Sequence, residues 1–299
     1  MEKDSEGDSA RSGMTARLRD LGLLMKFTLS FTVVFSSVVS YLLVPSVTFD
    51  ITSVLLLFTA GMLVTGSANA INQIVEKDTD AVMKRTAKRP VASGRMGVDE
   101  AWTYAAVAGI LGLSLMAWRF NTASAILSGV SLILYAFVYT PLKKVHSIAV
   151  LVGAVPGALP CLIGWVAGED GLSPGGWILF ALQFVWQFPH FWAIAWVVHS
   201  DYGRAGFRLL PSAGGPTKYA AVQAVLYTVI LFPIGVMPYV FGMSGAVSLA
   251  VVAMANLLLL WQCIRLFQRM DVGSARKVMF GSYIYLPVVL LALLADKAS

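Results

Sequence analysis

Nine apolar stretches of about 20 residues follow one another along this 299-residue chain and constrain its fold more than any other feature. A helix of that length crosses a hydrocarbon core of roughly 30 Å. With 58% hydrophobic and 13% charged residues, the composition lies outside the range of soluble domains. We therefore expect an all-α integral membrane protein. The stretches cover residues 22–45, 51–75, 99–118, 122–140, 147–168, 175–199, 218–241, 244–268 and 276–295.

The lysines and arginines predict an orientation for these helices. All 22 of them except Arg119 and Lys297 fall in the N-terminal arm, in alternate loops after the second, fourth, sixth and eighth stretches, or within the few residues of a stretch that border these segments. Such an excess of bases marks cytoplasmic loops. We expect a bundle of nine transmembrane helices around a central cavity, with the N-terminus in the cytoplasm. The net charge of +6 then results from the bases that flank helices in a lipid bilayer, which is the expected partner. It does not imply binding to a nucleic acid.

The first residues give no sign of a targeting segment. Residues 1–20 mix acids with bases and lack both the apolar core of a secretory signal and the acid-poor composition of a transit peptide. We predict a disordered cytoplasmic tail over residues 1–20 and a single transmembrane domain over residues 21–299. The expected location is the bacterial plasma (inner) membrane, as a multi-pass protein. Cys161 and Cys263 lie within predicted helices and are interpreted as core residues.

A charged segment interrupts the apolar pattern at residues 71–95, where three acids and six bases occur together. Asn69, Asn72, Glu76 and Asp80 are three or four residues apart, so they share one face if the preceding helix continues. Hard oxygen ligands of this kind suit magnesium better than zinc. The bases that follow suit a metal-bound polyanion such as a diphosphate. The plainer alternative is a solvated loop whose acids pair with neighbouring lysines and arginines.

A second long loop, residues 197–219, and a short basic segment add further candidates. Asp201 completes a second metal position or, alternatively, caps a helix. Lys143 and Lys144 follow the sequence YTPL, where they either anchor a helix end or neutralise a departing diphosphate. His190 stands among aromatic residues in WQFPHFWAIAW and is either a core residue or a contact for a large flat substrate. No catalytic-triad, Walker or dinucleotide-binding motif is found.

The charged segment resembles the first motif of the UbiA superfamily of intramembrane prenyltransferases. That motif reads Asn-Asp-x-x-Asp-x-x-x-Asp and is followed by a basic segment ending RTxxRP. Here NQIVEKDTD, from Asn72 to Asp80, precedes MKRTAKRP. Gln73 stands where the superfamily often has Asp, and Glu76 replaces the middle Asp. Glutamate still binds magnesium, so the second change affects the geometry more than the role.

Later segments resemble the heme-modifying members of that superfamily. They are YTPLKK, GAVPGALPCLIGW, WQFPHFWAIA with DYGRAGFRLLP, and ARKVMFGSYIYLPVVLLALLAD. The resemblance implies that farnesyl diphosphate, protoheme IX and water give heme O and diphosphate. The product would serve terminal oxidases, which makes a heme A synthase or a terminal oxidase assembly the implied protein partner.

The resemblance also implies a role for each candidate residue. Catalysis and binding of Mg²⁺ fall to Asn72, Glu76, Asp80 and Asp201. The diphosphate-binding residues are Lys84, Arg85, Arg89, Lys143 and Arg208, and the heme-binding residues are His190 and Trp186.

Three other functions compete with this one. A UbiA-type enzyme could prenylate another aromatic acceptor, such as a quinone precursor. A transporter or channel is disfavoured because the charges gather at one membrane face instead of forming a path through the bilayer. A noncatalytic heme-binding or assembly factor would not depend on the acidic face.

Overall fold

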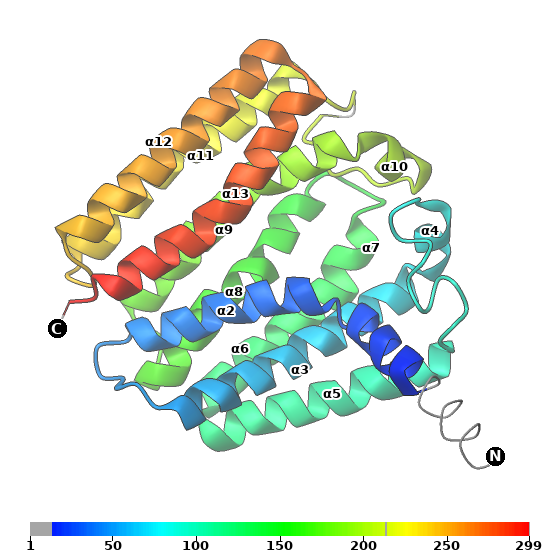
Figure 1. Cartoon of the computed structure of the whole chain (residues 1–299), viewed down its shortest axis with the longest axis horizontal. Coiled ribbons are helices and arrows are strands. Elements are labelled where there is room, and N and C mark those ends of the chain that lie inside the picture. Colours follow the sequence, from blue (N-terminus) through cyan, green and yellow to red (C-terminus); the bar gives the residue numbers. More distant parts are fainter. Residues whose placement is uncertain (1–13, 213, 299) are drawn as a thin grey trace, which may run out of the picture.

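The computed structural model describes residues 14–212 and 214–298, and these residues form a bundle of helices (Figure 1). The long helices are α2 (Phe27–Leu43), α3 (Ile51–Val75), α5 (Val98–Arg119), α6 (Thr122–Ile133), α8 (Ala149–Glu169), α9 (Pro174–Val197), α11 (Lys218–Val240), α12 (Ala246–Arg269) and α13 (Val272–Ala295). Short elements lie between them: α4 (Lys77–Val82), the π-helix η1 (Leu134–Tyr139), α7 (Thr140–Leu142) and α10 (His199–Arg204).

The predicted fold class is confirmed, with one refinement to the helix count. The described residues contain eight helices long and apolar enough to cross a membrane, counting α6, η1 and α7 as one. A ninth span exists if the helix Met14–Leu24 and α2 cross together, although they meet at a bend of 53°. The predicted stretch 22–45 is therefore not one straight helix. At Lys26 the backbone adopts a left-handed φ of 50°, which interrupts helical hydrogen bonding.

A helix, Met14–Leu24, includes the last part of the tail predicted for residues 1–20. Residues 1–13 lie outside the described residues, but residues 14–20 belong to the helix Met14–Leu24. Two ion pairs fix this helix: Arg17 pairs with Glu100 of α5, and Arg95 Nη2 lies 2.9 Å from Asp20 Oδ1. One base and one acid of the predicted tail thus connect the first helix to the rest of the bundle.

Helices α2, α8 and α9 approach one another closely because glycines and amides lie between them. A Cβ atom at Gly164 would come within 1.9 Å of the Ser37 carbonyl oxygen, so α8 and α2 touch backbone to backbone there. Toward α9, Gln183 Nε2 donates to the Gly157 carbonyl of α8 at 2.9 Å. Small residues and interhelical hydrogen bonds are the means by which helices associate in lipid.

The two bases outside the cytoplasmic pattern each contact the end of another helix. Lys297 Nζ donates to the carbonyls of Leu42 and Val44 at 2.9 and 2.7 Å, where α2 ends. Arg119 Nη2 donates to Ser53 Oγ at 2.7 Å in the first turn of α3. Lys297 thus pairs the free carbonyls at the C-terminal end of α2, and Arg119 joins the end of α5 to the start of α3. Each base therefore has a structural role whichever side of the membrane it occupies.

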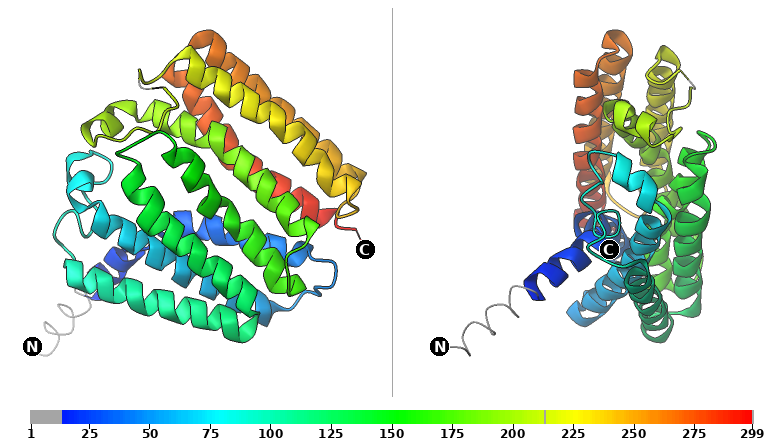
Figure 2. Two further views of the ribbon diagram at one scale, coloured as in Figure 1. Left: turned by 180° about the vertical axis from the view of Figure 1, so that it is seen from behind. Right: turned by 90° about the vertical axis from the view of Figure 1, so that its right-hand side faces the viewer.

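The basic loops gather along one edge of the molecule. Figure 1 shows α4, α10, the end of α7 and the turn between α12 and α13 along this edge, with the C-terminus at the opposite one. Both views in Figure 2 place α4 beside α10. The two long loops, far apart in sequence, therefore meet at one end of the bundle. That this end faces the cytoplasm stays a prediction.

Candidate functional site

The acidic face forms where α3 passes into α4. The Asp80 amide donates to the Glu76 carbonyl at 2.7 Å, so the helical turn continues across the junction between the two helices. Asn72, Glu76 and Asp80 consequently share one side and are 1%, 4% and 0% exposed. The charged segment is therefore not a solvated loop at these positions.

Asn72 joins three elements. Its Oδ1 accepts from Lys26 Nζ at 2.6 Å, and its Nδ2 donates to Glu76 Oε2 at 2.9 Å and to Thr140 Oγ1 at 3.1 Å. Lys26 and Thr140 were not among the predicted site residues. A lysine within the apolar stretch 22–45 was the signal for Lys26, because a base at membrane depth is costly without a function.

Each buried carboxylate has a basic partner: that of Glu76 lies at the end of α7, and that of Asp80 lies in the loop that follows α4. Lys143 Nζ lies 2.5 Å from Glu76 Oε1, and Arg89 Nη1 lies 2.6 Å from Asp80 Oδ2. The second oxygen of Asp80, Oδ1, is buried and has no hydrogen-bond partner among the described residues. A buried carboxylate oxygen without a partner is costly, so this atom is available to a ligand.

The charges in this cluster favour an anion. Three bases, Lys26, Arg89 and Lys143, surround the two carboxylates of Glu76 and Asp80. Burial lowers the pKa of Lys143, and the neighbouring Glu76 carboxylate opposes that shift. An incoming anion would favour the charged form of this lysine and oppose the lowering of its pKa by burial.

The neighbouring lysines at the end of α7 differ. Lys143 is 7% exposed and its ammonium lies 4.8 Å from the centre of the Tyr139 ring, whereas Lys144 is exposed. The Arg208 amide donates to the Lys143 carbonyl at 2.8 Å, which places the second long loop over this lysine. Lys143 therefore belongs to the charged cluster. Of the two lysines, the exposed Lys144 is the one positioned to anchor the helix end at the membrane surface.

Asp201 connects the two long loops. Its Oδ1 accepts from the Lys84 amide at 3.1 Å and its Oδ2 from the Arg85 amide at 3.4 Å. Arg204 Nη1 lies 3.6 Å from the same Oδ1. Both oxygens thus face backbone of the first loop, while the side chains of Lys84, Arg85 and Arg208 are exposed. No three acidic, histidine or cysteine side chains within the described ranges are close enough together to hold a metal.

His190 lies on α9, facing α13. Its Nδ1 lies 2.8 Å from Ser282 Oγ, and its ring stacks on Trp186 at a centroid distance of 4.7 Å. When the Ser282 hydroxyl donates its hydrogen to the Met279 carbonyl, 2.7 Å away, its oxygen accepts from the histidine. The hydrogen bonds therefore place the imidazole proton on Nδ1 and leave a lone pair on Nε2. Ser282, which has no predicted role, sets this tautomer.

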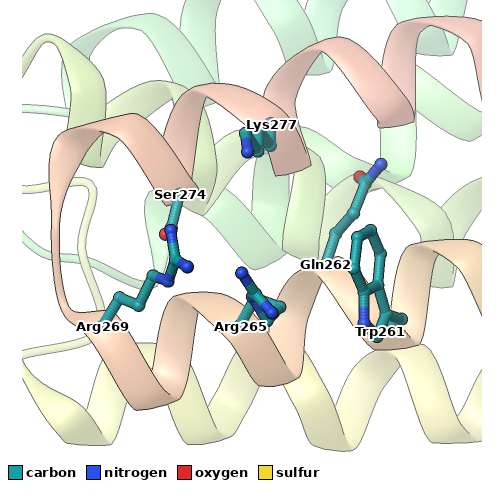
Figure 3. Close-up of a pocket in the computed structure, with 6 residues that line it drawn as sticks. All are labelled: Trp261, Gln262, Arg265, Arg269, Ser274 and Lys277. Carbon is teal, nitrogen blue, oxygen red and sulfur yellow. The ribbon is translucent and has the colours of Figure 1, made fainter.

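The two cavities identified lie away from the acidic face. One, of about 260 Å³, is lined by aromatic residues of α9 and α11 and by His146; the other lies between α12 and α13 (Figure 3). Neither is lined by Glu76 or Asp80. The acidic face is closed by its own ion pairs, so a charged ligand enters only by exchanging with them.

Comparisons with known proteins agree with this arrangement. The UbiA prenyltransferase family profile matches residues 33–286. A protein from Cytophaga hutchinsonii named protoheme IX farnesyltransferase is 45% identical over 276 residues, covering 92% of this chain and 96% of that protein.

Solved structures share the fold. A structure of digeranylgeranylglyceryl phosphate synthase superposes with a TM-score of 0.78 at 22% identity, covering 94% of this chain and 98% of that one. A UbiA homolog from Archaeoglobus fulgidus bound to GPP and Mg²⁺ gives a TM-score of 0.68 at 16% identity, covering 92% and 99%.

Proposed function

Because the chain belongs to the UbiA prenyltransferase family, and within it to the protoheme IX farnesyltransferases, we propose that it transfers the farnesyl group of farnesyl diphosphate to a vinyl group of protoheme IX. Water adds in the same reaction, and the products are heme O and diphosphate. The observation that carries the proposal is the 45% identity extending over 92% of the chain. The buried cluster of acids and bases supplies the chemistry for the diphosphate end.

The diphosphate binds by exchanging ion-pair partners. In the structure Arg89 and Lys143 neutralise Asp80 and Glu76. An incoming diphosphate takes both bases as its own partners. It has several charged oxygens, so it forms more charge-assisted hydrogen bonds with them than a single carboxylate does. Release of Asp80 and Glu76 then frees carboxylate oxygens at the same location.

The freed oxygens fit a magnesium ion. Asn72, Glu76 and Asp80, with Asp201 from the second loop, are the residues that would hold it. The buried Asp80 Oδ1, without a partner among the described residues, supports this assignment, as does a donor set made of hard oxygens. Bound with the diphosphate, magnesium supplies positive charge that stabilises the leaving group.

The remaining bases lie where the diphosphate would leave. Lys84, Arg85 and Arg208 are exposed on the two long loops, which Asp201 and the Arg208 amide tie to the buried cluster. We assign these three side chains to the outer oxygens of the diphosphate and assign Arg89 and Lys143 to the inner ones. Exposed bases contribute less each, because water and salt screen them.

Protoheme IX contacts His190 and Trp186 in this proposal. The lone pair on His190 Nε2 suits an iron ligand, and the Trp186 ring stacked on the imidazole offers a flat apolar surface. His146 has the opposite tautomer, because its Nδ1 accepts from the Ile148 amide at 3.0 Å and its proton therefore sits on Nε2. Of these two histidines, His190 is the better heme ligand.

The bond changes need no redox cofactor. The carbon–oxygen bond of farnesyl diphosphate breaks with both electrons leaving on the diphosphate, and an allylic cation remains. The π electrons of the vinyl group form the new carbon–carbon bond, and a water molecule captures the resulting cation and loses a proton. Apolar helices around the site protect the first cation from premature capture by water.

Mass spectrometry of heme extracted from membranes tests the acceptor and the reaction together. Membranes containing the chain, supplied with farnesyl diphosphate and protoheme IX, should yield heme that carries a hydroxyethylfarnesyl group. Membranes with the Asp80→Asn variant should not. Unmodified heme together with a prenylated quinone precursor would instead identify another aromatic acceptor. Unmodified heme that stays bound to the chain would indicate a noncatalytic heme-binding factor.

Location and partner follow from the product. The chain is a multi-pass membrane protein, and relatives such as that of Cytophaga hutchinsonii support placement in a bacterial plasma membrane. Heme O is apolar and membrane-bound, so it would pass to an enzyme that oxidises it or to a terminal oxidase under assembly.

A further inference from the structure

A basic pocket separate from the acidic face lies between α12 and α13 (Figure 3). Trp261, Arg265 and Arg269 are spaced four residues apart on α12, so they lie along one side of that helix. Across the pocket, α13 contributes Ser274 and Lys277. Figure 3 shows Arg269 extending toward Ser274, with Trp261 at the other end of the pocket.

The bases of this pocket are not neutralised by protein carboxylates. Within residues 14–212 and 214–298, no acid lies within ion-pairing distance of Arg265, Arg269 or Lys277. Asp271 is the acid between the two helices, and its Oδ1 accepts from the Ser274 amide at 2.6 Å as the cap of α13. Its negative charge is near Arg269, which leaves Arg265 and Lys277 as the uncompensated pair.

The position of the pocket along α12 corresponds to a membrane surface. From Trp261 to Arg269 the helix rises about 12 Å, which spans a headgroup layer and reaches the edge of the acyl chains. Tryptophan is enriched at that edge and bases at the cytoplasmic surface. Trp261 is 55% exposed, and Leu257 and Leu258, one turn further from the bases, are exposed apolar side chains. A ligand here meets positive charge near the end of α12 and an apolar surface nearer the middle of that helix.

We infer that this pocket binds the headgroup of an anionic glycerophospholipid. The phosphodiester lies between Arg265 and Lys277, and Ser274 Oγ is the neutral hydroxyl near it. The acyl chains run down the apolar face of α12 past Trp261. Basic pockets between transmembrane helices on the cytoplasmic side are suited to such headgroups. A free phosphate would contact only the bases and not the apolar face of α12. The combination of positive charge and apolar surface therefore favours a lipid.

The test is a lipid titration of the purified full-length chain in a neutral detergent, read by native mass spectrometry. Short-chain phosphatidylglycerol should bind. Phosphatidylcholine with the same chains should bind at least about tenfold more weakly. Glycerol phosphate, which has the headgroup charge without chains, should not compete at equal concentration. Equal binding of the two lipids, or full competition by glycerol phosphate, would overturn the inference.

Paired variants separate this pocket from general attraction to a basic surface. Arg265→Gln combined with Lys277→Gln should weaken phosphatidylglycerol binding about tenfold or more. Arg276→Gln combined with Lys218→Gln removes the same charge from exposed positions that do not line the pocket, and should leave binding unchanged. An equal loss in both pairs would show that only the net charge matters.

A third variant controls for folding. Arg265→Lys combined with Lys277→Arg keeps both charges and should retain binding if the pocket recognises the phosphate by charge. Loss of binding here, with thermal unfolding unchanged, would also contradict the inference. Because none of these residues touches the acidic face, heme O formation gives an independent readout, and failure of the lipid test would leave the proposed reaction untouched.

Discussion

Arg89 and Asp80 form an ion pair of 2.6 Å in which the carboxylate is completely buried and one of its oxygens has no hydrogen-bond partner among the described residues. The same aspartate is also fixed through its backbone, because Thr86 Oγ1 donates to the Asp80 carbonyl at 3.0 Å. The pair therefore has two consequences. It positions the loop after α4, and it keeps a carboxylate ready for a ligand that exchanges with the arginine.

Substitution of Asp80 by Asn should separate these two consequences. Asparagine keeps the size and can still accept a hydrogen bond from Arg89, so the loop should keep its position, but the negative charge is lost. We expect heme O formation to fall by about 100-fold or more. The measurement is the initial rate in membranes at fixed farnesyl diphosphate and protoheme IX.

Asp78 offers the matched control for that experiment, because it is an exposed aspartate two residues away. Asp78→Asn should retain the rate of the unmodified chain within about twofold, since exposed charges interact weakly. A rate in Asp80→Asn equal to that in Asp78→Asn would remove Asp80 from the reaction.

The pH dependence should report Lys143. Burial lowers the pKa of this lysine, so its positive charge is present at low pH and is lost, as the pH rises, earlier than that of an exposed lysine. The Michaelis constant for farnesyl diphosphate should therefore rise on the alkaline side. Lys143→Arg should move that rise to higher pH, because arginine keeps its charge.

Lys144→Arg is the control for that measurement, since Lys144 is the exposed neighbour. It should leave the pH profile unchanged. An alkaline limb at the same pH in Lys143→Arg as in the unmodified chain would assign the titration to another group.

The membrane spans and the acidic face could be predicted because both are local patterns. Span length depends only on consecutive apolar residues, and the shared face of Asn72, Glu76 and Asp80 depends only on helical spacing. The partners of that face could not be predicted in the same way. Lys26 and Lys143 come from other helices, and only the packing of α2, α3 and α7 brings them to the acids.

Gln73 illustrates the same limit. Its place in a metal-binding motif pointed to a lost carboxylate, yet its Nε2 donates to the carbonyls of Leu23 and Leu24 at 2.8 and 2.9 Å. Those carbonyls lie where the helix Met14–Leu24 ends before the bend. An aspartate could not donate to them, so the departure from the motif has a structural reason that depends on a distant segment.

Gln73→Glu should therefore destabilise the fold. It replaces the donor with a carboxylate that faces two carbonyl oxygens, at a cost of about 1–3 kcal/mol or more. Thermal unfolding in detergent should occur at lower temperature than for the unmodified chain. Gln268→Glu, the same change at an exposed position of α12, should not shift the transition. Equal transitions in the two variants would mean that the bend does not depend on Gln73.

The last prediction concerns Ser282 as a positioning residue for heme. Because Ser282 Oγ fixes the proton of His190 on Nδ1, Ser282→Ala should let the imidazole change tautomer and rotate. We expect the absorption spectrum of bound protoheme IX to change and its Michaelis constant to rise about tenfold, with that for farnesyl diphosphate unchanged. Ser282→Thr, which keeps the hydroxyl, should restore both. Ser200→Ala, at an exposed serine of α10, is the control. If Ser282→Ala and His190→Ala both bound heme with the unmodified spectrum and affinity, heme would have to bind elsewhere, and the aromatic cavity at His146 would be the next site to test.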